Sequence, residues 1–465
     1  MARLVMKFGG VSVADGKRLR HVGEMAKQFR DEGNEVVIIT SALQGVTDQL
    51  LECARKAAKE GNTADVEDFI KRLTERHSQT AADAIKDPKI LKEVQEVTAD
   101  KLNDLEKAYV GICYLGEITP RSLDYISGYG EQLAAPILSG VIRDLGIESK
   151  AYTGGDAGII TTSDYGDARP LEKTYELIPE RLMPLKGIPV ITGFIAKDEK
   201  GVTTTLGRGG SDFSASIIGA AIGADEIWFW KETLGILTTD PKIVPEAKTI
   251  PAISYKEAME LSFFGAKVLH PRAIEPAIKR EIPVRVKCTF DTTNPGTQIV
   301  HSDVPKEDVI KAVTLAKNVA LLNISGAEMI GAPGVAARAF TAMARTGVNI
   351  IMISQSSSEA NISVVVDARH LEKAEAALVT EFPRDQVKEI TNDKGISVVA
   401  VVGSGMAGTP GVAARVFKAM GGANINVMMI SQAASEHNIS FVVRSKDAER
   451  AVQELHREFG LYEVL

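Results

Sequence analysis

Short apolar runs alternate with longer stretches of helical spacing from the start of the chain to about residue 295. The helical spacing is clear over residues 17–30 and 213–220. Strands separated by helices form βαβ units, so this alternation predicts an α/β domain in which helices flank a mostly parallel sheet. The strands are expected at residues 4–8, 36–39, 190–192, 227–230 and 284–287.

Residues 62–112 differ from their surroundings, because they are more charged and their apolar positions have a longer period. Val66, Phe69, Ile70 and Leu73 follow the i, i+3, i+4, i+7 spacing of an amphipathic helix. We predict that this segment is a helical insertion in the first domain without chemistry of its own.

An internal repeat begins after the Asn-Pro-Gly sequence at residues 294–296. Three short motifs recur at one constant offset of 77 residues, which indicates a duplicated module. Each copy has the order strand, glycine-rich loop, helix, strand, turn, strand, and two copies favour a pair of small domains. We therefore predict a first domain over residues 1–300 and two small α+β domains over residues 310–385 and 395–465. The motifs are Gly-Val-Ala-Ala-Arg at 334–338 and 411–415, Ser-Gln at 354–355 and 431–432, and Asn-Ile-Ser at 361–363 and 438–440.

The composition narrows the class of protein further. The 465 residues carry a formal net charge of −7, so no basic excess exists to neutralise the phosphates of a nucleic acid. No apolar run reaches the ~18 residues of a membrane helix, and the start of the chain lacks the apolar core of a secretory signal. The three cysteines are far apart and the seven histidines are scattered, which argues against disulfides and metal sites. A cytoplasmic protein without a structural metal is expected.

A lysine and two glycines at the end of the first strand could bind a phosphate. In Lys7-Phe8-Gly9-Gly10 the glycines would let backbone N–H groups approach an anion closely, and Lys7 would add a compact positive charge. Taken alone, the segment is better explained as an ordinary tight turn. It is not a Walker A loop, because Arg18 stands where that motif needs Ser or Thr.

The second candidate is the loop at residues 203–212, which contains three glycines, Arg208 and Asp212 before an apolar helix. Ser211 or Asp212 is expected to cap this helix, whose N-terminus favours anions. Arg208 could hold a carboxylate through two parallel hydrogen bonds. A capped loop explains the glycines and Asp212 but not Arg208, so we favour a binding site here.

Three further segments are less specific. Residues 230–242 leave a buried strand at the edge where parallel sheets bind ligands, although a plain polar loop explains them equally well. Residues 264–271 place another lysine beside small residues, and His270 there is expected to be structural rather than a base. A Gly-x-Gly-x-x-Gly match at residues 403–408 follows a strand, but the first repeat lacks it and no acidic residue follows about 20 positions later. We interpret that match as a loop of the repeat.

Together these segments occur in the order typical of one family. The chain resembles the aspartate kinases of the amino-acid kinase family along its whole length. The repeat resembles a pair of ACT domains, the ferredoxin-like amino-acid sensors of that family. Each motif alone would be weak, whereas the ordered set is very specific. The matching motifs are Lys7-Phe8-Gly9-Gly10, Ser41-Ala42, Val46-Thr47, Gly130-Glu131, Gly193-Phe194, and residues 204–212 and 264–271.

The resemblance implies transfer of the γ-phosphoryl group of ATP to the side-chain carboxylate of L-aspartate. The products would be 4-phospho-L-aspartate and ADP, in the first step toward lysine, threonine, methionine and isoleucine. The unperturbed pKa of that carboxylate is about 3.9, so no general base is needed. Positioning and neutralisation of charge would carry the catalysis, with Mg²⁺ brought by the nucleotide.

The resemblance also implies roles for particular residues. Lys7 would stabilise the transferred group, and Asp212 would orient Lys7 rather than accept a proton. Glu131 would bind the amino group of aspartate, whose other contacts would be Ser41, Thr47, Phe194, Arg208, Gly209 and Ser211. The nucleotide would bind Lys7, Gly9, Gly10, Lys231, Glu232, Gly235, Leu237, Lys242 and Lys267. An allosteric amino acid would bind Gly334, Asn349, Gln355, Asn361, Asn426 and Gln432.

The sequence departs from the family pattern on the nucleotide side. Val11 replaces a Thr, and Lys231-Glu232-Thr233 replaces Thr-Asp-Val. Leu237 replaces a Tyr, and Lys242 replaces an Arg. The residues expected to bind aspartate match the family.

The repeats are expected to sense an amino acid. Gln355 and Gln432 each lie in Ser-Gln-x-x-Ser-Glu-x-Asn-Ile-Ser, as in threonine-sensitive members, so threonine is the first candidate effector and lysine the second. Alternatively, the repeats only assemble the protein, as a homodimer or a dimer of dimers. Two other functions stay open: a kinase of the same family that acts on glutamate or a related acid, and an amino-acid sensor without catalytic activity.

Overall fold

A computed structural model of the chain describes residues 1–263, 269–301, 309–382 and 389–463. Contacts between residues divide it into two compact units. The first unit contains Met1–Ile236, Pro251–Tyr255 and Val268–Ser302, and the second contains Leu237–Ile250, Lys256–Lys267 and Asp303–Leu465. Among the described helices, none is long and apolar enough to cross a membrane.

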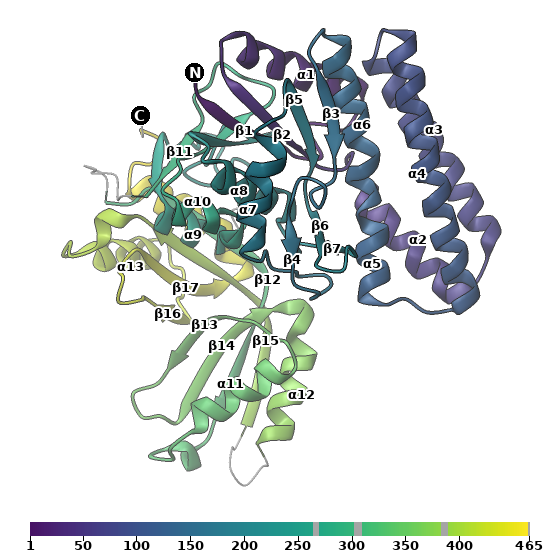
Figure 1. Ribbon diagram of the computed structural model, residues 1–465. Coiled ribbons are helices and arrows are strands. Elements are labelled where there is room, and N and C mark those ends of the chain that lie inside the picture. The colour runs from purple at the N-terminus through teal and green to yellow at the C-terminus, as the bar shows by residue number, and fades with distance from the viewer. Residues whose placement is uncertain (264–268, 302–308, 383–388, 464–465) are drawn as a thin grey trace. The chain divides into compact units, whose positions relative to one another are not determined.

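An eight-stranded sheet forms the centre of the first unit (Figure 1). Its strand order is β3-β5-β2-β1-β8-β10-β11-β9, and every neighbouring pair is parallel except β10 with β11. All five strands expected from the apolar runs are present, which confirms the mostly parallel α/β sheet. The strands are β1 (Arg3–Phe8), β2 (Glu35–Thr40), β3 (Ser149–Tyr152), β5 (Ile188–Thr192), β8 (Glu226–Lys231), β9 (Ala252–Ser254), β10 (Val284–Cys288) and β11 (Thr297–Val300).

The helices around this sheet are held by their apolar residues. Nearly every position of α8 (Gly210–Ile222) is buried, as expected for a helix that is apolar all round. In contrast, α1 (Gly16–Asp31) buries one stripe that includes Leu19 and Val22. The other elements of the unit are α5 (Pro120–Ser127), α6 (Tyr129–Asp144), α7 (Lys173–Leu182), a 3₁₀ turn η1 (Pro271–Ile274), α10 (Glu275–Lys279), and a small sheet of β4 (Ile160–Thr161), β6 (Ile195–Asp198) and β7 (Thr203–Thr205).

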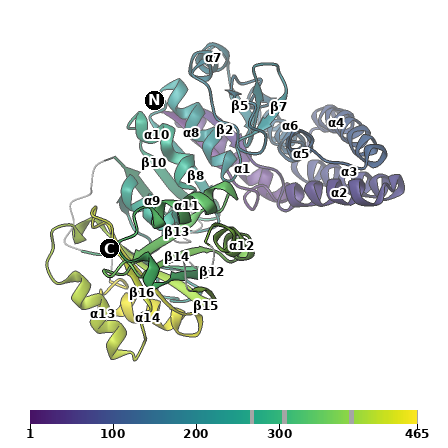
Figure 2. The same cartoon turned by 90° about the horizontal axis from the view of Figure 1, so that it is seen from below.

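The charged segment after α2 (Val46–Glu60) forms two long helices, α3 (Thr63–Ala84) and α4 (Pro88–Leu115). Figure 2 shows α2, α3 and α4 grouped at one end of the first unit. Asn62 and Asp87 cap α3 and α4 through their side chains. The apolar positions Val66, Phe69, Ile70 and Leu73 are all buried, so the amphipathic helix expected here is confirmed.

The second unit is built on a six-stranded antiparallel sheet of order β13-β14-β12-β15-β17-β16. The first copy of the repeat supplies β12 (Ala312–Ser325), β13 (Ile350–Gln355) and β14 (Asn361–Asp367). The second copy supplies β15 (Glu389–Val402), β16 (Met429–Ser431) and β17 (Asn438–Arg444). The long strands β12 and β15 pair with each other, so the two repeats share one continuous sheet.

Each repeat has the predicted order of elements, followed by one further helix. The glycine-rich loops contain the 3₁₀ turns η2 (Ala327–Met329) and η4 (Ser404–Met406), so the Gly-x-Gly-x-x-Gly match is a loop present in both copies. The helices are α11 (Val335–Arg345) and α12 (Leu371–Glu381) in the first copy, and α13 (Val412–Gly422) and α14 (Ala448–Glu458) in the second.

A segment that precedes the repeats in the chain packs into the second unit. Ile243 and Val244 are buried in the core of the second repeat together with Val416 and Val452. The backbone N–H of Val313 also donates to the Thr238 carbonyl at 2.8 Å. Residues 237–250 therefore pack as part of the second unit, although they precede the repeats in the chain and fall within the first domain expected from the sequence. Most of α9 (Tyr255–Phe263) also belongs to the second unit.

Candidate active site

A cavity of about 420 Å³ lies at the carboxyl ends of β1 and β2 in the first unit. Ligands of parallel α/β sheets bind at this edge. Its walls come from segments that are far apart in the chain, and most residues expected to bind aspartate are among them. The lining consists of Lys7, Gly10, Val11, Ser41, Ala42, Leu43, Gln44, Gly45, Thr47, Asp48, Glu131, Phe194, Gly207, Gly209, Gly210, Ser211 and Asp212.

Asp212 binds two lysines at the edge of this cavity. Its Oδ1 lies 2.5 Å from the Lys7 Nζ, and its Oδ2 accepts a hydrogen bond of 2.9 Å from the Lys231 Nζ. Burial alone would raise the pKa of Asp212, but Lys231 and Lys7 outweigh it and lower the pKa to about 2. Burial lowers the pKa of Lys7, and the Asp212 charge opposes that effect. Asp212 is therefore ionised at neutral pH.

The sheet explains why the two lysines meet one carboxylate. Lys7 pairs with Phe229 across the parallel strands β1 and β8. Lys231 lies two residues beyond Phe229, and successive side chains of a strand alternate between its faces. Lys7 and Lys231 therefore point to the same face of the sheet, on neighbouring strands and near their carboxyl ends.

The prediction that Ser211 or Asp212 caps α8 is wrong. The helix begins at Gly210, and its N-cap is Gly209 in the left-handed conformation with φ of 73° and no side-chain cap. Asp212 lies in the first turn, where its carboxylate binds the two ammonium groups instead of backbone N–H groups. A Cβ at Gly209 would also lie 2.7 Å from the His270 Cβ, so glycine is required on both grounds.

Glu131 is the second buried acidic residue of the cavity. It lies in the first turn of α6 and is only 4% exposed. Within the described chain its Oε2 has no hydrogen-bond partner. Burial raises the pKa of Glu131 to about 8, although a backbone hydrogen bond from Ala42 and the charge of Lys7 oppose the rise. The carboxyl group is therefore mostly neutral at pH 7, and it lines the cavity with one oxygen, Oε2, that has no hydrogen-bond partner among the described residues.

Tight packing brings Glu131 and Phe194 to the cavity. A Cβ at Gly130 would lie 2.7 Å from the Ala42 Cβ, so only glycine lets α6 approach the loop after β2 this closely. Phe194 adopts a φ of 68°, which is uncommon for a residue other than glycine. Its backbone N–H donates to the Ser214 Oγ at 3.0 Å and its carbonyl accepts from Leu206, so the strained conformation is held from both sides.

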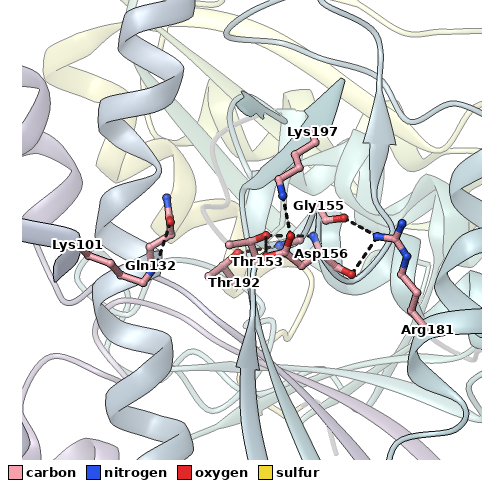
Figure 3. Close-up of polar contacts among 9 residues, drawn as sticks. Lys101, Gln132, Thr153, Gly155, Asp156, Arg181, Thr192 and Lys197 are labelled. Atoms are coloured by element: carbon pink, nitrogen blue, oxygen red, sulfur yellow. Dashed lines mark hydrogen bonds and ion pairs between the residues drawn. The ribbon is translucent and has the colours of Figure 1, made fainter. Parts of the chain in front are cut away.

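Polar contacts support the end of β5, which leads into Phe194. The Gly154 N–H donates to the Thr192 Oγ1 at 2.9 Å. Figure 3 shows Asp156 bound to Lys197, at 2.6 Å, and Arg181 reaching the carbonyls of the same turn. These groups satisfy one another, so the network fixes the turn after β3 against β5.

Asp124 is a supporting residue that the sequence analysis missed. It is buried and accepts hydrogen bonds from the Thr205 N–H at 2.8 Å, the Thr205 hydroxyl at 2.7 Å and the Gly166 N–H at 3.0 Å. These bonds hold β7 directly before the loop that carries Arg208. No local signal could have found it, because Asp124 and Thr205 are 81 positions apart.

The remaining residues that we predicted to bind aspartate or the nucleotide do not line the cavity. Arg208 is exposed and is not part of the cavity lining, and the Gly9 carbonyl accepts from Ser12 in the turn after β1. Lys231, Glu232 and Gly235 belong to the first unit, whereas Leu237 and Lys242 belong to the second. Lys267 lies outside the described residues.

The predicted effector residues all lie in the second unit at the ends of its elements. Gly334 precedes α11 with φ of 88°, as does its counterpart Gly411 before α13. Gln355 ends β13 and is exposed, and Asn361 begins β14. Asn349, Asn426 and Gln432 are exposed residues next to β13 and β16.

Fold and site together define a class of protein. A parallel α/β sheet whose strand ends present a lysine–carboxylate–lysine group is suited to binding and transferring an anionic group. The amino acid kinase family matches residues 2–288, and the ACT domain matches residues 322–382 and 399–459.

Known proteins make the assignment more specific. The chain is 34% identical over 467 residues to the chloroplastic aspartokinase 1 of Arabidopsis thaliana, covering 98% of this chain and 80% of that protein. E. coli aspartokinase III in complex with aspartate and ADP (R-state) has 27% identity and a TM-score of 0.83, covering 98% of this chain and 99% of that one. Its complex with lysine and aspartate (T-state) has 27% identity and a TM-score of 0.80 over the same shares. The chain belongs to the amino acid kinase family and, within it, is an aspartate kinase with two ACT domains.

Proposed function

We propose that the cavity beside Lys7 binds the L-aspartate that this enzyme phosphorylates, and that Glu131 receives the ammonium group of the substrate. The observation that carries this proposal is the buried Glu131 carboxyl group, whose Oε2 has no partner among the described residues. A buried carboxyl oxygen without a hydrogen-bond partner is costly, and a ligand ammonium would remove that cost. E. coli aspartokinase III binds aspartate in the same fold, which supports the proposal.

In the proposed reaction, an oxygen of the aspartate side chain attacks the γ-phosphorus of ATP. The bond from that phosphorus to the bridging oxygen breaks, and ADP leaves with the electron pair. The attacking carboxylate is already ionised at neutral pH, so no proton has to be removed. The protein must therefore align the reactants and stabilise the negative charge of the transferred group.

Lys7, which lines the cavity at the end of β1, is the proposed catalytic residue. Asp212 holds one face of its ammonium group, which leaves other N–H groups for the transferred phosphoryl oxygens. The Gly9 and Gly10 backbone would contribute further N–H donors. Asp212 stays ionised and orients Lys7.

The other proposed ligands follow from the family resemblance. Aspartate would also contact Ser41, Thr47, Phe194, Gly209 and Ser211, with Arg208 moving in from the exposed loop. ATP would bind Lys231, Glu232, Gly235, Leu237, Lys242 and Lys267, and Mg²⁺ would enter as part of the nucleotide substrate. In the described part of the chain, no group of three or more His, Cys, Asp or Glu side chains is placed to hold a metal ion.

The ACT domains are proposed to bind an amino-acid effector, with threonine as the first candidate and lysine as the second. The Ser-Gln-x-x-Ser-Glu-x-Asn-Ile-Ser motif favours threonine, whereas the lysine complex of E. coli aspartokinase III supports lysine. An effector can change activity only if it binds one of two conformations more tightly.

The two repeats differ in what their loops bind. In the second repeat, the Ser404 N–H donates to the Glu257 Oε1 at 2.7 Å, and the Asn438 amide donates to Glu260. Both acidic residues come from α9. In the first repeat the corresponding Asn361 side chain accepts from Ser363 of its own strand at 3.2 Å. We therefore place the effector first at Gly334, Asn349, Gln355 and Asn361.

Hydroxylamine trapping of the acyl phosphate tests this function. With ATP and Mg²⁺, aspartate should give hydroxamate while glutamate and N-acetylglutamate do not. Glu131→Gln should abolish the product at ordinary aspartate concentrations, whereas the exposed control Glu24→Gln should not. Product from glutamate would overturn the substrate assignment, and no product from any acid would leave an amino-acid sensor.

Adding threonine or lysine to the same assay tests the effector. Suppression by threonine that is lost in Gln355→Ala would support the first repeat as its site. If lysine suppresses the reaction and threonine does not, the effector is lysine rather than threonine. Assembly as a homodimer or a dimer of dimers stays a prediction, which light scattering after gel filtration can check. The cytoplasmic location also stays a prediction, which fluorescence microscopy can check.

A further inference from the structure

We propose that Arg76 of the helical insertion is a positioning residue for the aspartate cavity, because it holds the loop at residues 41–45 in place. The Nη2 of Arg76 donates a hydrogen bond of 2.8 Å to the Gln44 carbonyl oxygen, across 32 positions of the chain. The proposal rests on the function proposed for the cavity, since this loop forms part of the cavity wall. The insertion would thus contribute to substrate binding, although the sequence predicted no chemistry for it.

The loop at residues 41–45 joins the carboxyl end of β2 to α2. All of its residues line the cavity, as do Thr47 and Asp48 in the first turn of α2. The backbone of Ala42 also donates a hydrogen bond to the Glu131 carboxyl group. A displacement of the loop would therefore move proposed aspartate ligands and a donor to Glu131 together.

The tip of the loop depends on Arg76. Gln44 and Gly45 are exposed, and Gly45 precedes α2 with φ of 78° and no side-chain cap. Among the described residues, Arg76 is the only donor to the Gln44 carbonyl. The backbone of Gln44 also lies close to Gly10, where a Cβ would be 3.6 Å from the Gln44 Cα. Arg76 therefore fixes a residue that lies beside the turn after β1.

The packing of α3 determines where Arg76 points. Leu73 and His77, on either side of Arg76 in the helix, are 2% and 0% exposed. One turn later, a Cβ at Gly16 would lie 2.7 Å from the Thr80 carbonyl oxygen, so α3 is in direct contact with the start of α1. Arg76 itself is half-buried, and its planar guanidinium is a charged donor, which makes a stronger hydrogen bond to a carbonyl than a neutral donor does.

Loss of this hydrogen bond should weaken the binding of aspartate without slowing the chemical step. Lys7 and Asp212 form their own ion pair and do not need Arg76. The loop would contact the substrate in the ground state and in the transition state alike. We expect Arg76→Met to raise KM and the calorimetric Kd for aspartate by about three- to tenfold, with kcat changed less than about twofold. A fall in kcat with unchanged KM would overturn the proposal.

Arg72 provides the matched control. It lies one turn earlier in α3, lines the same cavity of about 570 Å³ between α2 and α3 as Arg76, and pairs with Asp68 of its own helix. Arg72→Met removes the same charge by the same substitution and should change the Kd for aspartate by less than about 1.5-fold. Thermal unfolding checks that both variants fold. Equal weakening in both variants would mean a general effect of charge, and normal binding in both would mean that the hydrogen bond has no influence on the cavity. Either result overturns the proposal.

Hydrogen exchange of the protein without ligands tests the loop itself. Peptides that cover residues 41–50 should exchange faster in Arg76→Met than in the unmodified protein or in Arg72→Met, because the loop opens more often without its restraint. Unchanged exchange there would overturn the proposal whether or not aspartate binds. Conversely, if the unmodified protein binds no aspartate, or Glu131→Gln binds it equally well, the function proposed for the cavity falls, whatever the exchange of the loop shows.

Discussion

Binding of aspartate should depend strongly on pH, because its proposed partner is a carboxyl group with an unusual pKa. Burial raises the pKa of Glu131 to about 8 in the free protein. Only the ionised form can pair with the substrate ammonium, so binding must first remove a proton. Loss of the proton becomes easier as the pH rises, and affinity should therefore increase with pH.

The size of the effect follows from the ionised fraction of Glu131. With a pKa of about 8, that fraction is about 1% at pH 6, about 9% at pH 7 and about half at pH 8. The apparent affinity scales with the fraction of protein that is competent to bind. Between pH 6 and pH 8 the dissociation constant for aspartate should thus fall by about 50-fold. The side-chain carboxylate of aspartate is ionised throughout this range and adds nothing to the change.

Isothermal titration calorimetry without nucleotide can measure both consequences. Titrations in two buffers with different ionisation enthalpies count the protons exchanged, and about 0.9 proton should be released for each aspartate bound at pH 7. Glu131→Gln should bind weakly and without this pH dependence. A dissociation constant that stays flat between pH 6 and pH 8, without proton release, would refute the assignment of Glu131 to the ammonium group.

Three further predictions test the packing around the site and the second unit. Asp212→Asn should lower kcat by at least about 100-fold while calorimetric binding of aspartate persists, and a kcat near normal would contradict its role. Gly130→Ala places a Cβ 2.7 Å from the Ala42 Cβ and should cost about 1–3 kcal/mol in thermal unfolding, whereas Gly111→Ala, with open space around it, should not destabilise. Lys311→Met leaves Glu257 buried without its 2.7 Å ion pair and should cost about 3–5 kcal/mol in denaturant unfolding. The added change Glu257→Gln should recover much of that loss, and equal stability of single and double variants would refute the argument.

The periodicity of the sequence predicted the elements of both units well. Apolar runs predicted the central strands because a parallel sheet is covered on both faces, so its strands are continuously apolar. The constant offset between motifs predicted the duplicated module, and the structure joins both copies in one sheet through β12 and β15. This joining could not be read from the repeat, since pairing between long strands depends on contacts far apart in the chain.

The sequence predicted only part of the site correctly. Motifs identified Lys7, Glu131 and Asp212, which the structure brings to one cavity. The helix start was wrong because capping rules consider only neighbouring residues, whereas the Asp212 carboxylate is drawn to two lysines from other strands. The contribution of Asp124 was missed for the same reason, as its partner Thr205 is distant in the chain.

The motifs are short segments whose residue types, spacing and order can be read directly from the sequence. They were therefore enough to indicate the family, the repeat and the main candidate residues. The ionisation state of those residues depends instead on burial and on neighbours that folding supplies. Glu131 has a pKa near 8 and Asp212 has one near 2, although both are ordinary acidic residues in the sequence. Only the folded chain removes water from Glu131 and places two ammonium groups on Asp212, and this difference in surroundings moves the pKa values of the two carboxyl groups in opposite directions.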